Sequence, residues 1–343
     1  MGKTNGKSGN RGGGPAGRSG KKFNITLRFA LAGAALLLAA LGICMAWAAR
    51  PRYEWYVEEG FESAWLRVLN TAGPPGSFKS APVVLAAGEK PPENPGGFLI
   101  TTRREETRAP VIVYPRLSFT LEYEGAHVLA LDPWMIYRQH IFPSLSRRRI
   151  ESAAGGEGIL VLPGKDPAAV RAWTARMVQE APGIFPRDQA VWDAATASLF
   201  TGSRFQRGSD TFTWQDVWYA LFGDEPAWVY APMSRIRDLP DYRTNILAAA
   251  PFPEPGNANV ISFQARILWA IPAGDAKVRA KLRQPLEWLK SAGTQTVIAD
   301  NLRWLPANPE GQPYDPAAMS ARLAWLTASY VWEDGRPEVR ERF

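Results

Sequence analysis

Apolar residues are distributed unevenly along the chain, and the longest apolar run lies near the N-terminus. Residues 29–49 contain no charged side chain, whereas residues 1–28 carry seven Lys or Arg residues and no acidic one. An α-helix needs roughly 20 apolar residues to cross a bilayer core, so the run predicts one transmembrane helix. Because basic segments are retained on the cytoplasmic side, we expect a single-pass protein of the cytoplasmic (inner) membrane. Its N-terminus would lie inside, and its main domain, from Pro51 onward, would be periplasmic or extracellular.

The same run allows two other outcomes. Ala46-Trp47-Ala48 fits the small-x-small pattern of a signal-peptidase site, and cleavage there would release the domain. Cys44 is a possible site of lipid attachment, although the bulky Ile43 before it favours an ordinary residue of a membrane helix. The length of the run and of the polar tail favours an uncleaved anchor.

The basic tail has little to bury. Residues 2–22 are mostly Gly, Ser and basic residues, so we expect disorder for the cytoplasmic segment 1–28. The tail lacks the interleaved aromatic residues that stack on nucleic-acid bases, and anionic lipid head groups are the nearer partner. The sequence therefore predicts the cytoplasmic membrane as a partner and no nucleic acid.

Beyond the apolar run, short stretches of β-branched and apolar residues alternate with helical patterns. Several stretches are continuously apolar, which is typical of strands covered on both faces. The predicted strands are Val83–Leu85, Phe98–Thr101, Val111–Tyr114, Val128–Leu131, Ile159–Leu162, Ile246–Ala248 and Ile267–Ile271. Strands that alternate with helices predict an α/β protein with crossover connections.

Helix starts are marked by capping residues. Asp166-Pro167 and Asp315-Pro316 each place an acceptor before a proline in the first turn, and Thr213 with Asp216 forms a capping-box pattern. A further helix is predicted from Asp275 onward, with a kink or break caused by Pro285.

Charge and cysteine content fit this division of the chain. The chain has 40 Lys and Arg against 33 Asp and Glu, and the excess of seven equals the charge of the tail. Cys44 is the single cysteine, so the exported domain has no disulfide and depends on core burial for its stability.

The most specific motifs lie between residues 223 and 310. The segments, in chain order, are Gly223–Trp228, Ala250–Pro253, Ala270–Pro272, Leu286–Leu289, Gln295 and Arg303–Asn308. Their order and spacing resemble the extracellular solute-binding proteins of ABC importers, in particular the family that binds sugars and oligosaccharides. In that family the corresponding segments are a G-x-x-A-M motif, an "aPlP" loop, a strand ending in A-I-P, an F-L-x-x-L helix, a short segment with Gln, and a "G-W-L-P-A" turn.

The resemblance implies a periplasmic-binding-protein-like, two-lobed α/β clamshell behind the transmembrane helix. Lobe 1 would comprise residues 51–150 plus 265–308, and lobe 2 residues 151–262 plus 309–343. It also implies a sugar as ligand and an ABC transporter permease as partner. The chain departs from the family at Ala265-Arg266-Ile267, where a glycine pair and a Trp are usual, and at Ala231-Pro232-Met233.

Aromatic residues supply the candidate ligand-binding positions. Trp134 follows a predicted strand, at the kind of position where α/β sheets place ligands. Trp228, Tyr230, Arg266 and Trp269 are added because they lie in the resembling region, residues 223–310. Aromatic faces stack on sugar rings, while Arg266 suits an anionic or hydroxyl-rich ligand, or an ion pair between the lobes.

Catalytic motifs are missing from the sequence. His127 and His140 have no carboxylate or cysteine cluster at metal-ligand spacing, and there is no G-x-S-x-G, H-E-x-x-H or phosphate-binding glycine loop. We therefore expect no enzyme activity, no cofactor and no metal site.

Two functions follow from these patterns. The first is a membrane-anchored, non-catalytic, solute-binding-like protein that binds a carbohydrate for ABC-type uptake or for sensing. The alternative is a structural or assembly scaffold of the cell envelope that kept the fold and lost the ligand. The surplus of aromatic residues favours the first function, and the altered cleft positions favour the second.

Overall fold

The computed structural model describes two units, residues 1–51 and 52–343. The described residues are 32–43, 45, 52–73, 77–78, 82–86, 89, 96–102, 122–123, 126–151, 159–180, 185–186, 188–201, 204–236, 239–253, 262–312, 316–326 and 330–333. The predicted tail 1–28, the predicted strand Val111–Tyr114 and Asp315 lie outside them.

In the first unit, residues 32–43 are helical and expose leucines such as Leu36, Leu37 and Leu38. Within the described residues, no helix reaches both the length and the apolar character that a membrane crossing requires. The predicted span 29–49 is only partly described.

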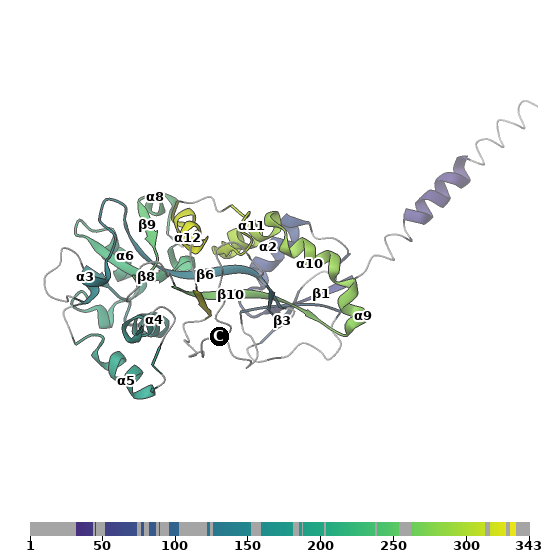
Figure 1. Ribbon diagram of the computed structural model, residues 1–343. Helices are drawn as coiled ribbons and strands as arrows, with labels where there is room; N and C mark the ends of the chain where they lie inside the picture. Colours follow the sequence, from purple (N-terminus) through teal and green to yellow (C-terminus); the bar gives the residue numbers. More distant parts are fainter. Residues whose placement is uncertain are drawn as a thin grey trace, which may run out of the picture. The chain divides into compact units, whose positions relative to one another are not determined.

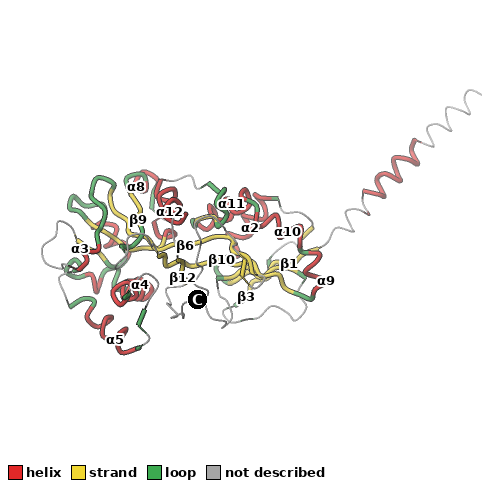
Figure 2. Tube along the Cα trace, in the orientation of Figure 1, coloured by secondary structure: helices red, strands yellow, loops and turns green. Residues whose placement is uncertain are grey.

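The second unit is built on a mixed sheet, drawn in yellow in Figure 2. The described strands run in the spatial order β2-β1-β4-β10-β6-β8-β7, and the other strands pair with β1, β6 or β10. Their bounds are β1 Arg52–Glu58, β2 Ser77–Phe78, β3 Val83–Leu85, β4 Gly97–Thr101, β5 Glu122–Tyr123, β6 Ala126–Gln139, β7 Ile159–Val161, β8 Ala227–Pro232, β9 Leu247–Ala250, β10 Ser262–Ala273, β11 Leu305–Pro306 and β12 Tyr330–Glu333.

Two long strands, β6 and β10, run side by side through the middle of this unit (Figure 1). They pair antiparallel from Ala265 opposite Pro133 to Ala270 opposite His127. From Trp134 onward, β6 pairs instead with β8 and β9. β6 is therefore the strand that joins the two parts of the sheet.

Helices cover the sheet, and several begin at the predicted caps. The bounds are α2 Glu62–Ala72, α3 Arg147–Glu151, α4 Pro167–Val178, α5 Gln189–Ser198, α6 Trp214–Leu221, α7 Met233–Ile236, α8 Asp241–Thr244, α9 Ala276–Lys281, α10 Arg283–Lys290, α11 Ala292–Leu302 and α12 Pro316–Leu326. Asp166 caps α4 by accepting from the amide of Ala168, and Thr213 and Asp216 form the predicted capping box of α6. The predicted helix from Asp275 is broken at Leu282, three residues before Pro285.

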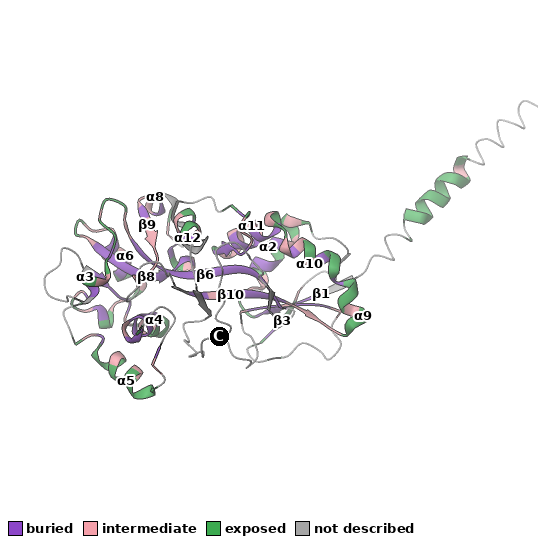
Figure 3. Ribbon diagram, in the orientation of Figure 1, coloured by how far each residue is buried: buried purple, intermediate pink, exposed green. Residues whose placement is uncertain are grey.

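Three buried cores are arranged along β6, which is buried from end to end except at its last two residues (Figure 3). The first core contains Leu129 and Ala130 of β6 together with Trp55, Trp65 and Phe98. The central core contains Val128, Leu131, Met135 and Tyr137 of β6, and the second core contains Trp134 and Ile136. Between Trp134 and Tyr137, alternation along the strand sends neighbouring side chains to the second and the central core in turn.

The predicted α/β class and most predicted strands agree with the structure. Parallel pairs occur between β1 and β4 and between β7 and β8, but β6 is antiparallel to β10, β8 and β9. The sheet is therefore mixed, with antiparallel pairing at its centre. The lobe boundaries predicted from the sequence remain a prediction.

Candidate ligand-binding site

A buried carboxylate marks the point where β6 changes partners. Asp132 is 1% exposed and lies opposite Arg266 of β10 in the strand register. The backbone amide and the hydroxyl of Ser234, in α7, donate to its two carboxylate oxygens at 2.8 and 2.7 Å. Asp132 therefore connects the central strand pair to the helix that follows β8.

Burial raises the pKa of Asp132 to about 6. The two hydrogen bonds from Ser234 and the charges of Arg266 and Arg235 act in the opposite direction, because each favours the ionised carboxylate. The guanidinium of Arg266 lies 5.5 Å from the ring centroid of Trp304, the residue before β11. The ion-pair role that the sequence allowed for Arg266 thus has a nearby acidic group, Asp132.

A second polar cluster is centred on Arg176 of α4, which is 1% exposed. Its Nε donates to the Tyr230 hydroxyl at 3.0 Å, and its Nη1 donates to Oε1 of Gln179 at 3.0 Å. The Tyr230 hydroxyl in turn donates to Oε1 of Gln264, on β10, at 3.3 Å. One guanidinium, one phenol and two amides, from α4, its C-terminal cap Gln179, β8 and β10, are therefore linked, and we call them the Arg176 cluster.

Aromatic rings enclose the Arg176 cluster. Trp134, Trp173 and Phe252 have ring centroids 5.4, 5.7 and 5.1 Å from that of Tyr230. The guanidinium of Arg176 lies 5.7 Å from the Tyr230 centroid and 5.6 Å from that of Phe252. Such contacts stabilise a cation that has been removed from water.

The structure brings two of the five sequence-predicted site residues together here. Trp134 and Tyr230 both belong to the second core and contact each other within the cluster. Trp228 also lies in the second core, where its indole N–H donates to the carbonyl of Pro143 at 3.0 Å. Trp269 lies in the central core, and Arg266 is half-buried beside Trp304. Whether these five residues contact a ligand remains a prediction.

Sequence reasoning missed the polar members of the site. Arg176 follows Trp173 by three residues, so it lies on the buried stripe of α4. A charged residue three positions after a core tryptophan, on the same face of a predicted helix, could have indicated a buried Arg176. Gln264 and Asp132 gave no comparable signal, because their surroundings depend on residues distant in sequence.

The Arg176 cluster combines polar groups with aromatic rings. Its guanidinium donates hydrogen bonds, its amides can donate and accept them, and the rings around them offer apolar faces. Among the described residues, no three His, Cys, Asp or Glu side chains are grouped as a metal site.

Comparisons with known proteins identify the fold. No protein-family model and no curated protein match the sequence. The bacterial solute receptor AcbH, which prefers β-D-galactopyranose exclusively, is similar with a TM-score of 0.56 and 12% identity, over 85% of this chain and 89% of that one. The binding protein MsmE of Bacillus subtilis, in an open conformation, has a TM-score of 0.58 and 9% identity, over 84% and 88%. RafE of Streptococcus pneumoniae, in its apo form, has a TM-score of 0.53 and 10% identity, over 83% and 89%.

The chain therefore has the fold of the bacterial solute receptors. This agrees with the resemblance of residues 223–310 to the solute-binding proteins of ABC importers. At such low identities the similarity establishes the fold and leaves the ligand open.

Proposed function

We propose that this protein is a non-catalytic, solute-binding-like receptor of the cell envelope and that its ligand is a carbohydrate. The observation that carries the proposal is the Arg176 cluster, a group of hydrogen-bonding side chains enclosed by aromatic rings in a solute-receptor fold. Sugar hydroxyls are bound by such donors and acceptors, and sugar rings stack on aromatic faces.

The geometry of the cluster supports exchange of its internal bonds for bonds to a ligand. Tyr230 accepts from Arg176 and donates to Gln264, so a ligand hydroxyl can replace either bond without leaving a buried group unsatisfied. Gln264 comes from β10 and Arg176 from α4, so the same ligand would connect two elements that are distant in sequence.

The proposal includes an anchor in the cytoplasmic membrane. It rests on the uncharged run 29–49 and on the basic residues before it, which favour retention of the N-terminus in the cytoplasm. The main domain would then face the periplasm or the extracellular space, where delivery to an ABC-type permease or a sensing role is possible.

The alternative function, an envelope scaffold, is favoured by one observation. Trp134, Trp228, Tyr230 and Trp269 are each at most 6% exposed and are packed among core side chains. In a scaffold, the Arg176 cluster would fix the packing of α4 against β8 and β10 and would bind no ligand.

Titration of the full-length protein with a panel of mono- and oligosaccharides distinguishes the two functions. An amine-oxide detergent is suitable for calorimetry because it carries no sugar head group. We expect saturable binding of at least one sugar, and Gln264→Ala should weaken it about tenfold through the loss of one or two buried hydrogen bonds.

Gln284→Ala is the matched control, since Gln284 is exposed on α10. It should leave sugar affinity unchanged. Failure of the whole panel to bind would favour the scaffold, and binding that is insensitive to Gln264→Ala would place the ligand elsewhere.

A further inference from the structure

Arg138, near the C-terminal end of β6, has an unusual environment. Trp134, Ile136 and Arg138 alternate along the strand, so their side chains lie on the same face of the sheet. Arg138 is half-buried, and its Nη2 donates to the hydroxyl of Ser144 at 3.0 Å. Ser144 lies in the segment between β6 and α3.

The rest of this guanidinium is buried without an acceptor. Nε and Nη1 of Arg138 are shielded from solvent and have no hydrogen-bond partner. Burial lowers the pKa of Arg138, and no described carboxylate raises it again. A buried N–H without an acceptor is costly, and more so when the group is charged, so this arrangement is unfavourable unless an anion is present.

The segment around Arg138 is basic, and the acidic residues nearest to it in the sequence are Asp132 and Glu151, one on either side of residues 133–150. Residues 133–150 contain four arginines and His140 but no Asp or Glu. The nearest preceding carboxylate, Asp132, is already held by Ser234. Arg148 of α3 is exposed, so the positive charge of this segment extends to the surface.

We propose that Arg138 and Ser144 form a binding site for a small oxyanion, either a carboxylate or a phosphate group. The planar guanidinium matches two oxygens of such an anion, and the Ser144 hydroxyl, which accepts from Arg138, has its own proton to donate. Tyr230 lies opposite Ile136, two residues from Arg138 along β6, but in the part of the chain that the structure describes Arg138 shares no hydrogen bond with the Arg176 cluster. The proposal does not depend on the proposed sugar ligand.

Thermal unfolding of the full-length protein in amine-oxide detergent tests the site. Sodium phosphate and sodium acetate are each compared with sodium chloride at equal ionic strength. We expect phosphate or acetate to raise the unfolding midpoint by about 3 °C near saturation, and the more effective salt identifies which oxyanion is preferred. Arg138→Gln should abolish the rise.

Arg148→Gln is the matched control, because it removes the same charge from an exposed position and should retain the rise. Arg138→Lys keeps the charge without the two-pronged geometry, and we expect it to weaken the anion affinity about tenfold, measured by calorimetry. An equal rise in Arg138→Gln would show general salt stabilisation and overturn the proposal. The absence of a rise in the unmodified protein would overturn it as well.

Discussion

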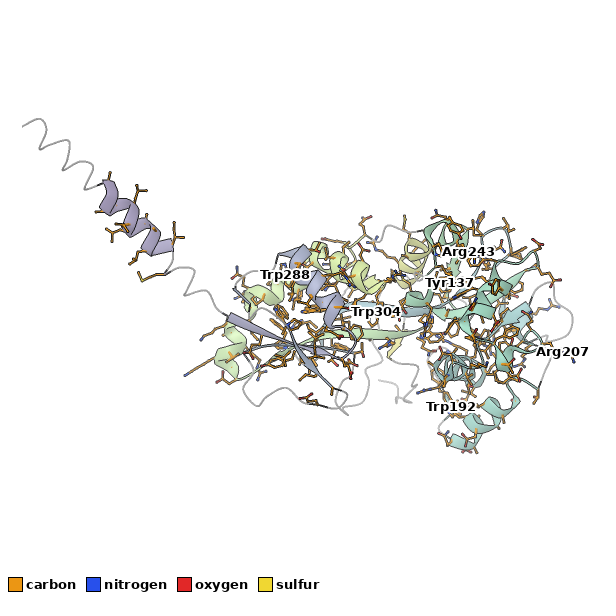
Figure 4. The ribbon with its side chains drawn as sticks, turned by 180° about the vertical axis from the view of Figure 1, so that it is seen from behind. Tyr137, Trp192, Arg207, Arg243, Trp288 and Trp304 are labelled. Atoms are coloured by element: carbon orange, nitrogen blue, oxygen red, sulfur yellow. The ribbon has the colours of Figure 1, made fainter. Side chains whose placement is uncertain are left out.

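The first and second cores both rely on aromatic residues, yet they use them differently. In the first core, Trp55 packs on other rings, with centroids 5.2 Å from Phe98, 5.4 Å from Trp65 and 6.2 Å from Trp288. In the second core, the rings of Tyr230 and Phe252 pack on a guanidinium as well as on Trp173. Figure 4 labels Trp288, which lies beside the first core and donates its indole N–H to the Ala72 carbonyl.

This difference separates stability from recognition. An aromatic core without a central charge gains free energy by burial alone, in proportion to the apolar area removed from water. A core that contains Arg176 must supply hydrogen-bond acceptors to that cation, and it gains specificity in return for part of its stability. We therefore expect the first core to contribute mainly to stability, while the proposed recognition of a polar ligand belongs to the second.

The largest effect is expected in the first core. Trp55→Ala removes a side chain that is 1% exposed and leaves a cavity between Trp65 and Phe98. We expect a loss of about 3–5 kcal/mol in the free energy of unfolding, measured by denaturant titration. Sugar binding by the remaining folded protein should be unchanged. A loss below about 1 kcal/mol would contradict the role assigned to this core.

The second-largest effect is expected at Asp132 of β6, where the free energy of unfolding should depend on pH. Burial raises the pKa of Asp132 to about 6. As the pH falls, the carboxylate of Asp132 is therefore protonated at a higher pH in the folded protein than in the unfolded chain. Protonation of Asp132 therefore adds about 3 kcal/mol to the free energy of unfolding. The added stability is fully present below about pH 4 and is lost as the pH rises through 6. Asp132→Asn should remove that part of the pH dependence.

The measurement is the free energy of unfolding between pH 4 and pH 8. Asp210→Asn, at an exposed position, serves as the control and should keep the pH dependence of the unmodified protein. An identical slope in Asp132→Asn and in the unmodified protein would show that Asp132 is not the titrating group.

The smallest effect on stability is expected in the second core, where a substitution of Tyr230 tests the hydrogen bonds of the Arg176 cluster. Tyr230→Phe keeps the ring beside Trp134 and Phe252 but removes the acceptor of Arg176 Nε and the donor to Gln264. We expect a loss of about 1–3 kcal/mol in stability, together with weaker sugar binding. Unchanged stability would mean that water replaces the hydroxyl without cost, which would contradict a closely packed Arg176 cluster.

Local features of the sequence predicted local structure well. The capping residues Asp166, Thr213 and Asp216 act within one helical turn, so their pattern sufficed to place the starts of α4 and α6. Val128–Leu131 predicted only the middle of β6, because Pro133 and the charged Asp132 and Arg138 conceal its full length. The antiparallel pairing of β6 with β10 joins residues more than a hundred positions apart, which alternation cannot reveal.

The site was harder to predict than the fold. Trp134 and Tyr230 were expected to bind a ligand, and the structure brings them together. Trp228 lies in the same core but donates to the Pro143 carbonyl, and Trp269 lies in the central core. Aromatic residues serve burial and recognition equally well, so residue type alone does not separate the two roles. What distinguishes the two roles is the set of polar side chains beside the rings, and in the Arg176 cluster these come from elements distant in sequence.

The position of β6 also bears on how this unit unfolds. Because one strand supplies side chains to all three cores, a slip of one residue would exchange the cores that neighbours such as Trp134 and Met135 enter. Neither end of the strand can detach without exposing apolar surface on which the other end depends. Loss of structure at one end of β6 is therefore expected to weaken the packing at its other end.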